Sequence, residues 1–355
     1  IILRTVQNIS SLTIAASVLL FLAAILAAVV ANSSLSPVYQ DFLLQELHLR
    51  IGNFNLFSHG GHPLKMIEFI NDCLMTVFFL AVGLEIKREL LVGELSSVRK
   101  AALPFIAACG GMVVPVVIYA LSVASGTPET RGMAIPMATD IAFSLGVLSL
   151  LGKRVPLSLK IFLTAFAVVD DIGGILVIAL FYSADVAYGY LIAAAVLYVF
   201  LYYMGKFGVT QKIFFLFFGV IIWYLFLQSG IHSTISGVIL AFVIPARPRL
   251  DAGKYIERIR DIIGEFPVSK SDNIVLTNAQ IATLKQVERA SDYVISPLQS
   301  LEDNLHGAVS FVILPLFAFA NAGVVFSGSG SIVGDVSIAC CWASSWGYTC
   351  LRGWR

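Results

Sequence analysis

Long apolar runs, separated by short polar connections, follow one another along most of the chain. A helix that crosses a bilayer needs roughly 20 mostly apolar residues. We therefore predict an all-α polytopic membrane protein, because repeated runs of this length are typical of that class. Spans are expected at about 12–31, 67–84, 101–123, 134–151, 161–182, 187–204, 213–228, 231–245 and 307–326.

Lysine and arginine gather in every second connection between these runs. The rich connections are those at 85–100, 153–154, 206–212 and 246–306. The connections that alternate with them, such as 124–133 with its single Arg131, are poor in basic residues. Because short loops rich in lysine and arginine stay in the cytoplasm, the rich connections and the amino terminus are predicted to be cytoplasmic.

The connection at 32–66, on the opposite side, is less apolar than the spans. Within it, Gly52 and Asn53 form a turn pair that is flanked by alternating apolar residues. This pattern predicts a short β-hairpin at 49–57.

The connection at 246–306 is the one segment with the composition of a soluble protein. Ile256, Ile259 and Ile263 fall on one helical face, which favours an amphipathic helix on the membrane surface. Thr277 and Gln280 have the spacing of a capping box that opens a second helix. The plainer interpretation is a solvated connecting or regulatory loop.

The composition of the chain argues against several classes of protein. With 58% hydrophobic and 13% charged residues, the chain is too apolar for an ordinary soluble domain. The net charge of +1 says nothing about nucleic acid, but no basic stripe or nucleic-acid motif is present, so no nucleic-acid partner is expected. No glycine-rich nucleotide loop is present, and the five cysteines lack metal-ligand spacing. We expect a lipid-embedded protein without a cofactor, not an enzyme.

Asp140 is a carboxylate inside the predicted span 134–151. Pro136 lacks a backbone N–H, so a helix break is expected there, with the carbonyl of Gly132 left free. Thr139 and Asp140 would then lie near the start of the following half-helix, where negative charge is favoured. The alternative is a kinked helix whose aspartate caps its own broken turn. Acids within spans usually mark an ion or proton path.

Asp170 and Asp171 stand side by side within the predicted span 161–182. They differ by about 100° around a helix, so one can line a cavity while the other faces a neighbouring helix. Burial and mutual repulsion favour protons on such a pair, whereas a bound Na⁺ requires the carboxylates to be deprotonated. The pair therefore holds either protons or a cation, which is the chemistry of cation/proton exchange. The alternative is a structural acid pair held by a lysine such as Lys160.

Several motifs, spread from about residue 10 to 326, resemble signatures of the NhaA-type sodium/proton antiporters of bacterial membranes. They are Phe78–Leu90, Ala138–Phe143, Arg154–Lys160, Ser229–Thr234 and Ile313–Val324.

This resemblance implies an inverted-repeat transporter fold with discontinuous helices near the bilayer midplane. It implies electrogenic, pH-responsive exchange of Na⁺ or Li⁺ for H⁺ across the bacterial inner membrane, by alternating access. It also implies a homodimer that uses the hairpin at 49–57.

The resemblance carries roles over to individual positions. Asp170 and Asp171 match the acids that bind cation and protons, and Thr139 and Asp140 match the broken-helix stretch beside them. The positions tied to pH response are Glu85, Arg88, Glu89 and Glu302, with the histidines His232 and His306. The plainer alternatives are ordinary interfacial charges for the acidic cluster and a packing role for His232.

Residues 327–355 differ in composition from the transporter-like part at 1–326, which includes the connection 246–306. Three of the five cysteines and three of the four tryptophans lie at 340–355. Codons for these residues begin with T, and a one-base shift turns each T into a second base that encodes apolar residues. We hypothesise a frameshift near Ala339, with the carboxyl-terminal spans of the family missing. The alternatives to antiport are a non-transporting remnant and another cation transporter or channel that uses the same acids.

Overall fold

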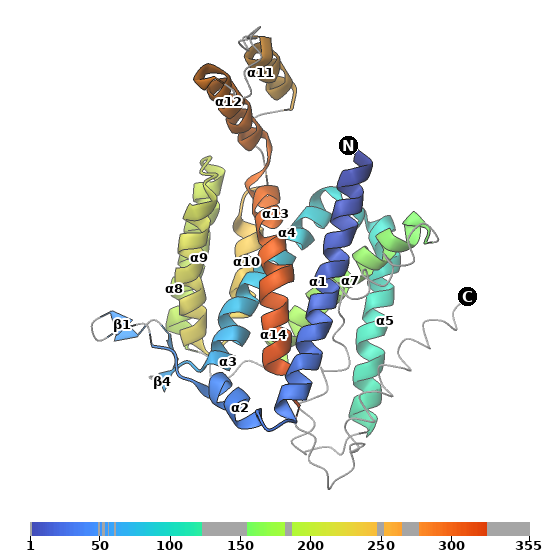
Figure 1. The fold of residues 1–355 in the computed structure, drawn as a ribbon, viewed down its shortest axis with the longest axis vertical. Helices are drawn as coiled ribbons and strands as arrows, with labels where there is room; N and C mark the ends of the chain where they lie inside the picture. Colours follow the sequence, from blue (N-terminus) through green and yellow to red (C-terminus); the bar gives the residue numbers. More distant parts are fainter. Residues whose placement is uncertain are drawn as a thin grey trace.

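The computed structural model describes residues 2–48, 50–51, 54–55, 57–59, 62–122, 155–181, 187–246, 252–264 and 277–324. Within these ranges the chain is helical apart from two small hairpins (Figure 1). The first half contains α1 (Ile2–Ala31), α2 (Ser36–Leu44), α3 (Met66–Phe69), the π-helix η1 (Ile70–Leu74), α4 (Met75–Val92), the short η2 (Glu94–Ser96), α5 (Val98–Ser122) and α7 (Leu157–Phe181). The second half contains α8 (Tyr188–Lys206), α9 (Lys212–Ser229), α10 (Thr234–Val243), α11 (Ala252–Gly264), α12 (Asn278–Val294), α13 (Pro297–Ala308), the π-helix η5 (Val309–Ile313) and α14 (Leu314–Asn321).

Most predicted spans lie in long helices. Among the described residues, five helices are long and apolar enough to cross a membrane, or six if the pair α1 and α2, bent by 113°, counts as one span. The predicted span 161–182 lies in α7, which has 25 residues. The predicted span 134–151 lies outside the described residues. The prediction of an all-helical, multi-span protein is therefore confirmed for the part of the chain that the structure describes.

Two span boundaries differ from the prediction. The run 231–245 contains only α10, whose 10 residues span about 15 Å, half the hydrocarbon thickness of a bilayer. Gly230 in the left-handed region ends α9 before it, and Pro245 follows the extended Ile244 after it. Hydropathy alone did not detect these breaks.

The last described span begins ten residues before the predicted 307. Ser296 accepts a hydrogen bond from the backbone N–H of Gln299, and Pro297 occupies the first helical position, where its missing N–H costs nothing. The helical run from Pro297 to Asn321 is continuous through η5. The cytoplasmic connection predicted at 246–306 therefore ends near 296, and Glu302 and His306 belong to a helix of the bundle.

α4 occupies the middle of the bundle, in contact with α7, α10 and α13 (Figure 1). Glycine allows the closest of these contacts. A Cβ at Gly237 of α10 would lie 2.4 Å from the carbonyl oxygen of Thr76, and a Cβ at Gly83 would lie 2.8 Å from Cβ of Ala241. Small residues at such crossings let helix backbones approach within a membrane.

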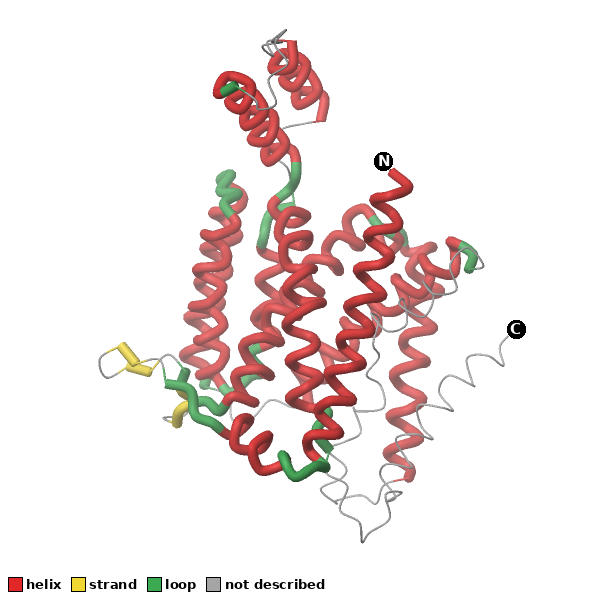
Figure 2. The backbone as a smooth tube through the Cα atoms, in the orientation of Figure 1, coloured by secondary structure: helices red, strands yellow, loops and turns green. Residues whose placement is uncertain are grey.

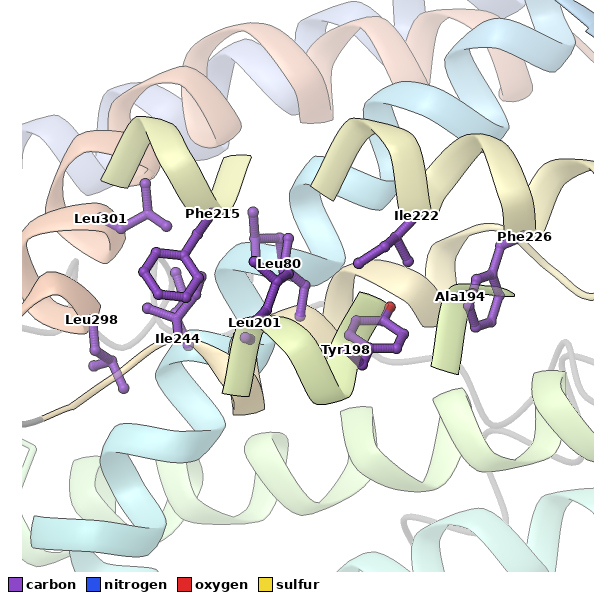
Figure 3. Close-up of a cluster of buried hydrophobic side chains, with 13 residues drawn as sticks. Leu80, Ala194, Tyr198, Leu201, Phe215, Ile222, Phe226, Ile244, Leu298 and Leu301 are labelled. Carbon is purple, nitrogen blue, oxygen red and sulfur yellow. The ribbon is translucent and has the colours of Figure 1, made fainter. Parts of the chain in front are cut away.

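The largest buried cluster joins α8 and α9 to α4, α10 and α13 (Figure 3). Phe215 and Ile222 of α9 lie in it with Leu201 and Tyr198 of α8. The Tyr198 hydroxyl donates to the carbonyl oxygen of Ser236 at 2.8 Å, which satisfies the polar end of an otherwise apolar side chain.

The predicted hairpin is confirmed. β1 (Arg50–Ile51) pairs antiparallel with β2 (Phe54–Asn55), with Arg50 opposite Asn55. The sequence analysis missed a second hairpin, β3 (Ser58–His59) with β4 (His62–Pro63). Figure 2 shows both, in yellow, at the end of the bundle opposite α11 and α12.

α11 and α12 form a helical pair that extends from the bundle (Figure 1). The capping box at the start of α12 is confirmed. The Thr277 backbone N–H donates to Oε1 of Gln280 at 2.9 Å, and the Gln280 N–H donates to Oγ1 of Thr277 at 3.4 Å. On α11, Ile256 and Ile263 are each 58% exposed. The amphipathic helix is therefore present, and its association with a membrane surface stays a prediction.

Candidate functional site

The two adjacent acids lie near the middle of α7. Asp170 is buried, with 5% of its surface exposed, whereas Asp171 is partly exposed. This difference follows from the rotation of about 100° between consecutive helical residues. α7 therefore presents one carboxylate to the packed interior and one to a more open side, as the spacing predicts.

The central helix α4 packs on α7 close to the two acids. Val168, two residues before Asp170, lies in one apolar cluster with Val82 and Ile86 of α4, and Ile172 packs at its edge. The residues that contact the central helix thus lie on both sides of the two aspartates in the sequence.

α5 packs against the same region of α7. A Cβ at Gly173 would lie 2.0 Å from the sulfur of Met112, and Phe166 lies 3.5 Å from the Cβ position of Gly111. Glycine therefore lets α5 approach within one turn of the aspartates.

The other two residues of the predicted cation site, Thr139 and Asp140, lie outside the described residues, together with Pro136. Within the part of the chain that the structure describes, no three His, Cys, Asp or Glu side chains lie together as metal ligands. The described part of the site thus contributes the carboxylate pair, and its relation to Thr139 and Asp140 stays a prediction.

A second charged group gathers at the end of α4. Arg88 lies 3.6 Å from a carboxylate oxygen of Glu89 and 3.2 Å from one of Glu302 on α13. The Arg88 Nε atom is buried and not aligned for a hydrogen bond, so its contact with Glu302 is an ion pair. Glu85 lies within electrostatic reach of this group and of His306. The structure therefore brings together five of the six residues predicted to respond to pH.

His232 lies elsewhere, in the connection between α9 and α10. Its Nδ1 is buried and has no hydrogen-bond partner among the described residues. The structure separates this histidine from the acidic cluster on α4, so the six predicted positions do not form one group.

Sequence reasoning missed Asp72, a further acid within a span. It lies in η1, where the wider π-turn leaves its carbonyl oxygen available to hydroxyls of Thr76 and Ser233 and to the indole N–H of Trp223. The Ser233 hydroxyl also lies 3.1 Å from its carboxylate. The signal was present, since Asp72 is an acid in an apolar run, but it stood near the predicted edge of the span at residue 67.

Comparison with known proteins shows to which group this bundle belongs. The family described as Na⁺/H⁺ antiporter 1 matches residues 7–347. The chain is a member of this family. A Na⁺/H⁺ antiporter NhaA of Bacteroides thetaiotaomicron is 75% identical over 338 residues, which cover 95% of this chain and 77% of the relative. The NhaA of Bacteroides fragilis is 74% identical over the same shares, and that of Porphyromonas gingivalis is 47% identical over 92% of this chain and 73% of the relative.

Membership of the NhaA family establishes that the chain is a multi-pass membrane protein of a transporter family, not an enzyme. It confirms the resemblance inferred from the sequence motifs. The chain is shorter than these relatives. The segment 327–355, with its proposed frameshift, lies outside the described residues, and that hypothesis stays untested.

Proposed function

We propose that this NhaA-family chain exchanges Na⁺ or Li⁺ for H⁺ across the bacterial inner membrane by alternating access at Asp170 and Asp171. The observation that carries the proposal is the carboxylate pair near the middle of α7, with Asp170 buried and the nearby Val168 packed on the central helix. Acids at this depth are costly and usually serve ion or proton movement.

Competition between ligands supplies the exchange step. When the pair is protonated it carries no charge, and low polarity favours that state. When Na⁺ enters, its oxygen ligands must release their protons. If both aspartates discharge protons for one Na⁺, each cycle moves net charge, so the exchange is electrogenic. One carboxylate pair therefore couples the two fluxes without a further energy source.

Thr139 and Asp140 are proposed to complete the site from a broken helix, within an inverted-repeat fold. The helix start after Pro136 would favour the negative charge of Asp140. This part of the proposal rests on the sequence and on the family resemblance.

The charged group at the end of α4 is proposed to respond to pH. Glu85, Glu89 and Glu302 surround Arg88, so proton uptake by any of these acids changes the attraction between α4 and α13. Since Val82 and Ile86 of α4 pack on α7, this attraction is mechanically linked to the aspartates. His306, which lies within electrostatic reach of Glu85, and His232 are further candidates.

The amino terminus is proposed to face the cytoplasm, with a homodimer formed through the hairpin at 49–57 on the opposite side. The amino terminus and the α11–α12 pair lie at one end of the bundle, and β1 to β4 lie at the other (Figure 1). This arrangement agrees with the distribution of lysine and arginine.

Everted membrane vesicles test the exchange itself. In vesicles from cells that lack other antiporters and express this 355-residue chain, respiration builds a proton gradient. We expect added Na⁺ or Li⁺ to dissipate the gradient and K⁺ to leave it intact. Na⁺ flux that proceeds equally without a proton gradient would instead indicate a channel, and no response would indicate a non-transporting remnant.

A further inference from the structure

α10 differs from the other bundle helices, because it is short and its two ends lie within the protein. It starts after a connection at 230–233 and ends before Pro245. The last carbonyls of any helix have no partner within the helix. Inside a membrane such groups are costly unless other parts of the protein satisfy them.

Lys87 of α4 supplies the partner at the carboxyl end of α10. Its ammonium group donates to the carbonyl oxygen of Phe242 at 2.7 Å and to that of Ala241 at 3.3 Å. It also contacts the carbonyl oxygen of Ile244. One side chain thus satisfies three carbonyls and places a positive charge where the helix dipole is negative.

Asp72 meets the opposite end of α10 in the complementary way. The hydroxyl of Ser233, the residue before α10, lies 3.1 Å from both the carbonyl oxygen and Oδ1 of Asp72. A carboxylate at a helix start is favoured by the dipole. The acid at one end and the base at the other therefore match the polarity of α10.

The contacts between the two ends show that α4 and α10 run parallel. Asp72 meets Ser233, Thr76 meets Gly237, and Lys87 meets the end of α10. Parallel neighbours align their dipoles side by side, which is unfavourable. Opposite charges supplied by the α4 span at the two ends compensate for this repulsion.

We infer that Lys87 is a positioning residue for transport, which holds α10 to α4 so that both helices move as one unit against α7. The neighbouring Ile86 packs on Val168, two residues before Asp170. Lys87 thus joins α10 to the helix that contacts the carboxylates. The transport part of this inference rests on the proposed function, whereas the attachment of α10 does not.

The test compares Lys87→Met and Lys87→Arg with the wild-type chain, and uses the exposed Lys206→Met on α8 as a matched control. Hydrogen–deuterium exchange of the purified protein reports the attachment. We expect amides at 240–244 to exchange about tenfold faster in Lys87→Met, and at the wild-type rate in Lys87→Arg and Lys206→Met. If the amides at 240–244 exchange hydrogen for deuterium at the wild-type rate in Lys87→Met, the inference is overturned.

The rate of antiport in everted vesicles, compared at equal amounts of protein in the membrane, tests whether Lys87 has a positioning role in transport. We expect Lys87→Met to lower the maximal rate about tenfold, with the half-saturating Na⁺ concentration within about twofold of wild type, and Lys87→Arg to restore the rate. A wild-type rate in a Lys87→Met protein whose α10 end is loosened would refute the positioning role.

If Lys87→Met does not accumulate in the membrane, Lys87→Gln keeps a neutral donor to the carbonyls, and a partial loss in both readouts is expected. If the wild-type chain shows no exchange, the proposed function fails, while the amide measurement still decides whether Lys87 holds α10.

Discussion

Arg88 is the cation around which three carboxylates gather, two of them on its own helix and one on α13. The Arg88 side chain is partly exposed, so the ion pairs themselves add little to stability. The cluster matters because protonation changes the force between two helices. Its contribution should therefore appear in the pH dependence of transport more than in stability.

Removing Arg88 should move the pH profile of antiport. The Arg88→Gln variant leaves three carboxylates together without their cation, so proton uptake becomes more favourable. We expect half-maximal activity at a pH higher by about half a unit or more, and an opposite shift for Glu302→Gln, which removes one acid. Vesicle assays across a pH series measure both.

Arg88→Lys keeps the charge and serves as the control for Arg88→Gln. Identical pH profiles in the wild type and the Arg88→Gln variant would contradict the assignment of this cluster to pH response.

At the scale of elements, the contact between α4 and α10 depends on glycine. Gly237 stands where any Cβ would meet the backbone of Thr76 and Leu80, which cannot move aside as a flexible side chain would. The close approach also lets Lys87 reach the end of α10. Packing and capping therefore depend on the same short distance between the two helices.

A larger residue at Gly237 should weaken the bundle. For Gly237→Val we expect a loss of about 1–3 kcal/mol, seen as a lower melting temperature of the detergent-solubilised protein. Gly189→Ala on α8 is the control, because no atom lies within 4 Å of its Cβ position. Equal melting temperatures for the wild type and Gly237→Val would show that this contact is looser than described.

Hydropathy and charge predicted most spans, the hairpin at 49–57 and the carboxylate pair, because each leaves a local pattern. The half-length of α10 could not be predicted, since its apolar run has the same composition as a full span. The meeting of Arg88 with Glu302 joins residues far apart in sequence, and only the family resemblance grouped them. Asp72 is visible in the sequence as an acid near the edge of a span, but its contacts with Ser233 and Trp223 depend on a π-turn, which has no simple sequence signal.

At the scale of the whole molecule, the bundle has two different ends. One end carries the helical pair α11–α12, and the other carries the four short strands (Figure 2). The side-chain amide of Gln228 donates to the carbonyl oxygen of Ser58 at 2.6 Å, which ties the second hairpin to α9. The hairpin β1–β2 precedes this anchored pair in the chain and is the surface that the proposed homodimer would use.

Replacing residues 50–55 with a Gly–Ser segment should shift the protein from dimer to monomer in detergent, measured by light scattering after size exclusion. Exchange in vesicles should persist, because α7 and its contacts with α4 are unchanged. The same replacement at 207–211, between α8 and α9, is the control and should leave the dimer intact. A dimer that survives the change at 50–55 would place the interface elsewhere.

The central claim is that Asp170 and Asp171 bind the exchanged ions, and proteoliposomes test it most directly. We expect liposomes that contain the purified wild-type chain and are acidic inside to take up ²²Na⁺, in exchange for protons that leave down the imposed pH gradient. Asp170→Asn and Asp171→Asn should each lower the initial rate by at least about a hundredfold, since each removes a charge that the cation needs. The exposed Asp41→Asn on α2 should match the wild type. Wild-type uptake in both α7 variants would contradict the account.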